Sequence, residues 1–98
     1  MKTITVIIGN SDDKLTQARW SAFVNSVALR IGELAHQVHF AGGSGNSAPW
    51  QNSGWVFEIK EVWQLKKLKD ELAGVAHTFE QRSIAWLESD GELILAKP

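Results

Sequence analysis

The chain has no cysteine and no tyrosine, and only two of its 98 residues are proline. Without cysteine there is no disulfide framework and no cysteine-ligated zinc or iron–sulfur site. No apolar run approaches the roughly 18 residues of a membrane span. A large excess of charge is also lacking, because the formal net charge is −1, and such a balance offers no positive field for nucleic acid. We therefore expect a cytoplasmic protein that binds no cofactor, enters no membrane and does not act on nucleic acid.

What the chain does contain is enough apolar material for one core. Hydrophobic residues make up 44% of the sequence, and its length is typical of a single domain, so we expect residues 1–98 to form one unit. The first apolar residues, Ile4, Val6 and Ile8, alternate with other residues and stop at Gly9. That short alternating run predicts a strand and not a signal peptide.

Periodicity predicts a mixed α+β fold. Alternating patterns mark strands near 3–8, 38–41, 55–60 and 83–87, and apolar steps of three and four mark helices over about 17–34 and 62–79. Asp90-Gly91 is a hairpin signal that predicts a further short strand at 93–95. The order βαββαβ is that of a ferredoxin-like two-layer sandwich, here with an extra C-terminal hairpin strand.

In that topology one sheet face carries only apolar residues and should lie under the helices. The opposite face is mixed in composition, and the alternation leaves it without an aromatic side chain, which argues against base stacking of the kind seen in RNA-binding sheets. The residues expected to face the helices are Ile4, Val6, Ile8, Val38, Phe40, Trp55, Phe57, Ile59, Ile84 and Trp86.

The same topology gathers three connecting loops at one end of the sheet, and loops carry binding residues more often than core elements do. We call this end the loop rim. An alternative is that its polar residues serve only as helix caps, turns and solvated charge. The candidate binding residues on the rim are Asp12, Asp13, Lys14, Gln17, Trp50, Gln51, Asn52 and Arg82.

Trp50 stands out because it follows Pro49 in a polar loop. It is either a lid folded over the core or an exposed anchor of the kind found in binding hot spots. The glycine-rich stretch 42–46 lacks the Gly-Lys-Ser/Thr ending of a phosphate loop. Asp12 and Asp13 lack the spacing and closing glutamate of a calcium loop, so we expect no metal there.

Three stretches together carry a resemblance to a known group of proteins. They are GNSDDKLTQ at 9–17, SAPWQN at 47–52 and QRSIAW at 81–86. With these stretches the chain resembles small proteins of actinobacteria and their bacteriophages, a group without an assigned activity. The resemblance therefore supplies no catalytic residues. It implies a small protein that binds and alters a component of the bacterial host.

Three classes of function remain open. The first is a non-catalytic binding or regulatory protein that acts on a protein partner through the loop rim or the open sheet face, or that forms a homodimer. The second is a module that binds a small molecule or nucleotide at the same rim. The third is a small enzyme using Asp12, Asp13 or a histidine. No acid–base pair is evident from spacing, so we expect binding in preference to catalysis.

Overall fold

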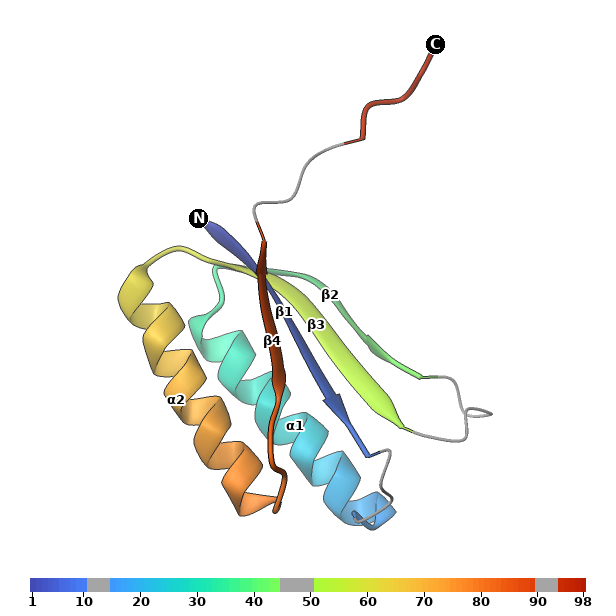
Figure 1. The fold of residues 1–98 in the computed structure, drawn as a ribbon, viewed down its shortest axis with the longest axis vertical. Helices are drawn as coiled ribbons and strands as arrows, with labels where there is room; N and C mark the ends of the chain where they lie inside the picture. Colours follow the sequence, from blue (N-terminus) through green and yellow to red (C-terminus); the bar gives the residue numbers. More distant parts are fainter. Residues whose placement is uncertain (11–14, 45–50, 90–93) are drawn as a thin grey trace.

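The computed structural model describes residues 1–10, 15–44, 51–89 and 94–98. Two helices lie side by side on one face of a four-stranded sheet (Figure 1). This arrangement confirms the expected two-layer α+β class. The elements are β1 (Lys2–Gly9), α1 (Gln17–Leu34), β2 (Gln37–Gly43), β3 (Asn52–Ile59), α2 (Val62–Thr78) and β4 (Ala85–Ser89).

The sheet has the strand order β2-β3-β1-β4, and every neighbouring pair is antiparallel. β1 is central, so that Val6 lies between Trp55 of β3 and Trp86 of β4. The edges of the sheet are β2 and β4. Neither helix in the described part of the chain is long and apolar enough to cross a membrane.

The helices begin where side chains satisfy the first backbone groups. The Thr16 hydroxyl accepts a hydrogen bond from the Arg19 amide at 3.2 Å, which caps α1. At the start of α2, the Gln64 side chain accepts from the Glu61 amide at 3.0 Å. Each helix then buries one stripe against the sheet. The buried residues are Trp20, Phe23, Val27, Ile31 and Leu34 of α1, and Leu68, Leu72, Val75 and Ala76 of α2.

The core lies between the helices and the two inner strands. Ile4, Val6 and Phe57 are completely buried. Phe23 of α1 stacks on Phe79, just after α2, with ring centroids 5.2 Å apart. This pair joins the two helices at the end where α1 begins and α2 ends. The aromatic contact adds to the area that the rings bury.

One expectation about the faces is wrong: Phe40 does not lie under the helices. The register of β2 on β3 shifts between Val38, which pairs with Phe57, and Phe40, which pairs with Val56. His39 is the extra residue, as in a β-bulge. Because paired side chains share a face, the shift places Phe40 on the side away from the helices.

The face away from the helices, here called the open face, therefore contains an aromatic residue after all. Phe40 lies there with the side chains that the alternation assigned correctly. The residues of the open face are Thr3, Thr5, Ile7, Gly9, Gln37, Phe40, Gly42, Asn52, Gly54, Val56, Glu58, Ala85, Leu87 and Ser89.

The two edge strands are less covered than expected. Val38 of β2 is exposed, and Trp86 of β4 is half-buried although it points toward the helices. Trp86 packs against the core, with an edge-to-face contact of its ring with Phe57 at 6.3 Å between centroids. The helices are centred on the inner strands, so the edges receive partial cover.

The extra C-terminal strand is not formed by its described residues. Ile94 and Leu95 lie outside any strand and are almost fully exposed, and the chain end lies away from the sheet (Figure 1). The turn at Asp90-Gly91 falls outside the described residues. A pairing of about three residues on an edge strand gives few hydrogen bonds to offset the entropy of ordering.

The contrast between two phenylalanines tests this register. We expect Phe57→Ala to lower the free energy of unfolding by about 3–5 kcal/mol, because it empties a fully buried site. The matched change Phe40→Ala should cost under about 1 kcal/mol, because that ring is exposed. Denaturant unfolding of the two variants measures both values. Equal losses would contradict the bulge.

Candidate functional site

Part of the predicted loop rim is assembled as expected. Gln17, at the start of α1, and Gln51, just before β3, exchange two amide hydrogen bonds of 2.8 and 3.0 Å. Buried Asn10 joins them, because its side-chain amide donates to Gln51 Oε1 at 3.2 Å and its backbone amide donates to the Gln51 carbonyl at 2.8 Å. The connections after β1 and before β3 thus lie at one end of the molecule.

The local backbone explains why these amides meet. Asn10 folds the chain after β1 by donating to the Leu15 carbonyl and accepting from the Leu15 amide. These two bonds hold Leu15, just before α1, beside the residue that follows β1. Asn52 follows Gln51, and its backbone closes the β2–β3 ladder with Ser44. The described rim residues hold the loops together. This is the structural role that the sequence analysis gave as the alternative to a binding role.

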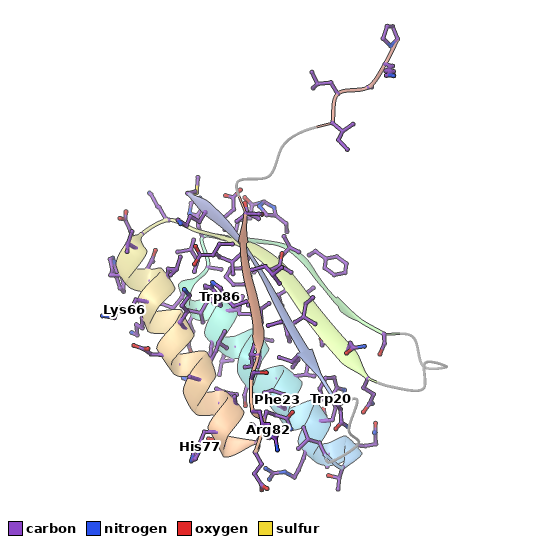
Figure 2. The ribbon with its side chains drawn as sticks, in the orientation of Figure 1. Trp20, Phe23, Lys66, His77, Arg82 and Trp86 are labelled. Carbon is purple, nitrogen blue, oxygen red and sulfur yellow. The ribbon has the colours of Figure 1, made fainter. Side chains whose placement is uncertain are left out.

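The other candidate residues are not described as part of this network. Arg82 lies after the C-terminal end of α2 (Figure 2), where it lines a cavity and not the Gln17–Gln51 network. Asp12, Asp13, Lys14 and Trp50 lie outside the described residues. Among the predicted site residues, the structure therefore brings together Gln17, Gln51 and Asn52, and Arg82 lies at the same end of the molecule without a bond to them (Figure 2).

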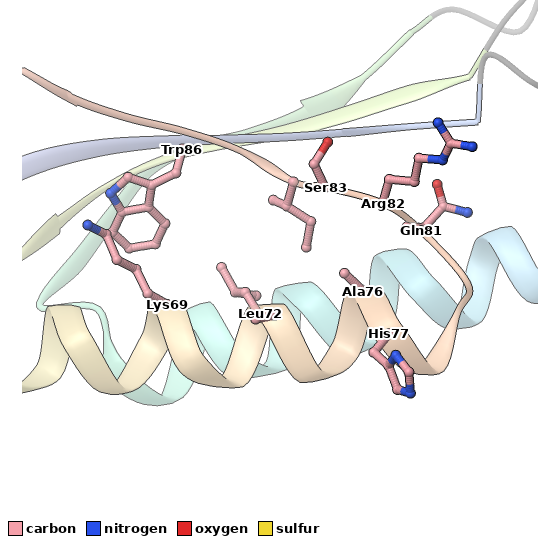
Figure 3. Close-up of a pocket in the computed structure, with 10 residues that line it drawn as sticks. Lys69, Leu72, Ala76, His77, Gln81, Arg82, Ser83 and Trp86 are labelled. Atoms are coloured by element: carbon pink, nitrogen blue, oxygen red, sulfur yellow. The ribbon is translucent and has the colours of Figure 1, made fainter.

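A cavity of about 540 Å³ lies between α2 and the segment leading into β4 (Figure 3). We call it the α2–β4 groove. Figure 3 shows Leu72 and Ala76 rising from α2, with Trp86 beside Lys69 at one end. Its size falls within the range of about 300–1,000 Å³ typical of ligand sites. The groove is lined by Lys69, Leu72, Ala73, Ala76, His77, Gln81, Arg82, Ser83, Ile84 and Trp86.

Sequence reasoning missed this groove because it placed Trp86 in a closed core. A usable signal was present in α2. The small residues Ala73 and Ala76 line the groove on α2, opposite the larger Ile84 and Trp86, and their short side chains leave the space between α2 and β4 unfilled. Such a pairing of small residues with an edge strand indicates incomplete packing.

Glu88 contacts three donors, and two of them, Trp86 and Lys69, line one end of the groove. Its carboxylate accepts from the Trp86 indole N–H at 3.1 Å, and it forms ion pairs with Lys2 at 3.1 Å and Lys69 at 3.2 Å. The Lys69 ammonium also lies 5.3 Å from the centre of the Trp86 ring. These contacts, the indole hydrogen bond first, lower the pKa of Glu88 from 4.5 to about 2.

Within the described ranges, no group of three or more histidine, aspartate or glutamate side chains is placed to hold a metal ion. His39 lies 3.1 Å from Glu58, but both groups sit on the sheet surface, outside the α2–β4 groove. The described chemistry is that of amides, one carboxylate cluster and apolar surfaces, which suits binding.

No family model matches this chain, and no curated protein matches it either.

Acid titration tests the Glu88 cluster. The low pKa means that the ionised carboxylate stabilises the fold above about pH 4.5, and that this contribution disappears as the pH falls toward 2. Carbon-13 NMR of the side-chain carboxyl should place its midpoint near pH 2. Trp86→Phe and Lys69→Met should each raise that midpoint, whereas Lys66→Met, on the same helix, should leave it unchanged. A wild-type midpoint near 4.5 would disprove the cluster.

A double-mutant cycle tests the rim network. We expect Gln17→Ala and Gln51→Ala to be coupled by about 0.5–1 kcal/mol, because they exchange two hydrogen bonds at the surface. The cycle isolates this pair from the other contacts of Gln51. Denaturant unfolding of the two single variants and the double variant gives the coupling. Strict additivity would mean that the two amides do not hold the loops together.

Proposed function

We propose that this chain is a small non-catalytic binding protein that engages a partner protein through the open face of its sheet. One observation carries the proposal. Phe40, Leu87 and Ile7 lie on that face with 58%, 53% and 43% of their surface exposed. No helix covers this side of the sheet (Figure 1), and exposed aromatic and aliphatic side chains gathered on one face are typical of protein interfaces.

The shape of the face favours a protein surface over a small ligand. Phe40 lies against Gly42, where an added Cβ would come within 2.8 Å of its ring. The opposite residue on β3 is Gly54. These glycines leave only a shallow hollow of about 270 Å³ beside the ring. A flat patch with a single projecting aromatic suits a complementary apolar surface.

The charge of the face argues against nucleic acid. An exposed aromatic on a sheet can stack on a base, but single-stranded nucleic acid also requires a basic groove to track its backbone. The described strand positions of the open face carry one acid, Glu58, which lies 3.1 Å from His39, and no lysine or arginine. Lys2 points to the other side, where it pairs with Glu88. A predominantly apolar, uncharged partner surface is therefore the better match.

Self-association through the same face is the competing arrangement. A four-stranded sheet of this length offers about 450 Å² per copy, or about 900 Å² in a face-to-face dimer. Stable interfaces bury about 1,200–2,000 Å². A homodimer on this face would therefore be weak, whereas a different partner is able to extend beyond the sheet and bury more.

The alternative function, a module that binds a small molecule or nucleotide at the rim, receives less support. The described rim amides of Gln17 and Gln51 bond to each other, and a ligand would have to displace those bonds. No cofactor enters the proposal.

The proposal also includes two expectations from the sequence, the ferredoxin-like topology and the resemblance to actinobacterial and phage proteins. The ferredoxin-like topology is supported by the position of β1 between β3 and β4 and by antiparallel pairing throughout. If the resemblance to actinobacterial and phage proteins holds, the partner is a protein of the bacterial host and the site of action is the host cytoplasm.

Two exposed aromatics provide a matched test. Phe40 lies on the open face, and Trp63, which is 61% exposed, lies at the start of α2. A partner captured with the wild-type protein from actinobacterial lysate is identified, purified and titrated against both variants. Phe40→Ser should weaken binding at least tenfold, as expected for a hot spot. Trp63→Ser should change it less than twofold.

Light scattering distinguishes self-association through the open face from binding of a different partner protein. The isolated protein should be monomeric at micromolar concentration. If wild type is a dimer that Phe40→Ser dissociates, the face serves self-association. If Phe40→Ser and Trp63→Ser bind the purified partner equally well, the open face is not the interface.

A further inference from the structure

The α2–β4 groove lies on the helix side of the sheet, opposite to the open face, and the proposed function assigns it no role. Its floor is apolar, because Leu72 and Ala76 are buried and Ile84 and Trp86 are half-buried. Ala73 lies on the exposed wall. An apolar cavity of about 540 Å³ on a small protein is large enough to accept several side chains or a short chain segment.

The groove is bordered by strand edge, which supplies directional hydrogen-bonding groups. β4 is the last strand of the sheet and, among the residues that the structure describes, pairs only with β1. Its outer row of N–H and C=O groups therefore has no partner strand. In the part of the chain that the structure describes, Arg82, Ser83 and Ile84 also make no backbone hydrogen bond. The free row thus continues along the groove from Arg82 to Ser89.

The segment that carries this edge is held in position at its start. The Gln81 amide donates to the Ala76 carbonyl at 2.8 Å, and the Glu80 amide donates to the His77 carbonyl at 3.1 Å. Glu80 has a φ of 58°, so these bonds form the left-handed C-terminal turn that commonly ends a helix. A ligand at the groove therefore meets an edge that is already ordered, which lowers the entropic cost of binding.

The charged side chains that line the groove are basic, and the acidic Glu88 lies beside the Lys69 end, where it pairs with Lys69. Lys69 and Arg82 are among the lining residues, and no aspartate or glutamate is. Lys69 is engaged by Glu88 at 3.2 Å. Arg82 forms no ion pair within the described residues, and it lies at the other end of the groove (Figure 3). The Arg82 end is therefore complementary to an acidic group.

We propose that the α2–β4 groove binds an extended peptide segment that adds a strand to the outer edge of β4. Apolar side chains of the peptide enter the cavity between Ala73 and Trp86, and an acidic residue at one end of the segment pairs with Arg82. The backbone bonds provide affinity and the alternate side chains provide selectivity, as in other cases of strand addition. The proposal is independent of the open-face interface.

An apolar acid such as a fatty acid fits the cavity and the charge but not the edge. A hydrocarbon chain leaves the N–H and C=O groups of β4 without partners, whereas a peptide backbone satisfies them. The unpaired edge is therefore the observation that favours a peptide. Dodecanoate serves as the competing probe in the experiment.

The experiment is a selection of displayed random octapeptides on the purified full chain. Two variants define the site. Ala73→Phe fills the exposed wall of the groove without touching the buried core, and Arg82→Glu reverses the charge at its end. Lys66→Glu is the matched control, because it reverses an exposed charge on α2 that does not line the groove (Figure 2). Circular dichroism verifies that each variant is folded.

The enriched peptides should alternate apolar residues and carry an aspartate or glutamate at one end. A synthetic peptide of the enriched sequence should bind wild type and Lys66→Glu equally. It should bind Ala73→Phe at least tenfold more weakly, and Arg82→Glu should prefer the peptide in which lysine replaces the acidic residue. Amide-proton NMR shifts on binding should be largest from Arg82 to Ser89.

Three results would overturn the proposal. The first is a selection that enriches no sequence on wild type over Ala73→Phe. The second is an enriched peptide whose binding is unaffected by both groove variants. The third is a groove that responds to dodecanoate while the enriched peptide shifts amide resonances elsewhere. Loss of open-face binding in Phe40→Ser leaves each of these outcomes unchanged, so the two proposals fail separately.

Discussion

The burial of the two inner strands under two helices is the constraint on which the rest of this structure depends. Ile4 and Val6 of β1 and Trp55 and Phe57 of β3 are buried together, and both helices direct their apolar stripes at this pair. The helices are thereby centred on β1 and β3. The edge strands receive what cover is left, so Val38 on β2 is exposed and Trp86 on β4 is half-buried. The groove along β4 is a direct result of that centring.

Two polar networks lie at opposite ends of the sheet, and the order of the strands determines which residues meet in each. Because β1 ends beside the start of β3, Asn10 and Gln51 meet across the end of the sheet, and Gln17 joins them from the first turn of α1. At the opposite end of the sheet, Glu88 gathers Lys2 from β1 and Lys69 from α2. Each network ties one end of the sheet to a neighbouring helix.

The features that periodicity controls were predictable from the sequence. The stripe from Trp20 to Leu34 predicted α1 within its observed bounds, and the element order placed Gln17 and Gln51 at the same end. The pairing of those two amides was not predictable, because side-chain rotamers depend on the loop conformation. Phe40 was assigned to the wrong face because a one-residue register shift leaves no mark on an alternating pattern. Trp86 was misplaced because the sequence gives residue size but not the separation of α2 from β4.

The register shift at His39 also has a consequence for how this protein can change over generations. Upstream of the shift the strand alternates in one phase and downstream in the other, and His39 is the residue that separates the two phases. Loss of the His39 codon would place Phe40 directly after Val38, so the alternation would become continuous while Phe40 kept its place on the open face. The bulge can therefore be lost without changing the face on which the ring lies, and related sequences that differ in length here would differ in the bend and twist of β2.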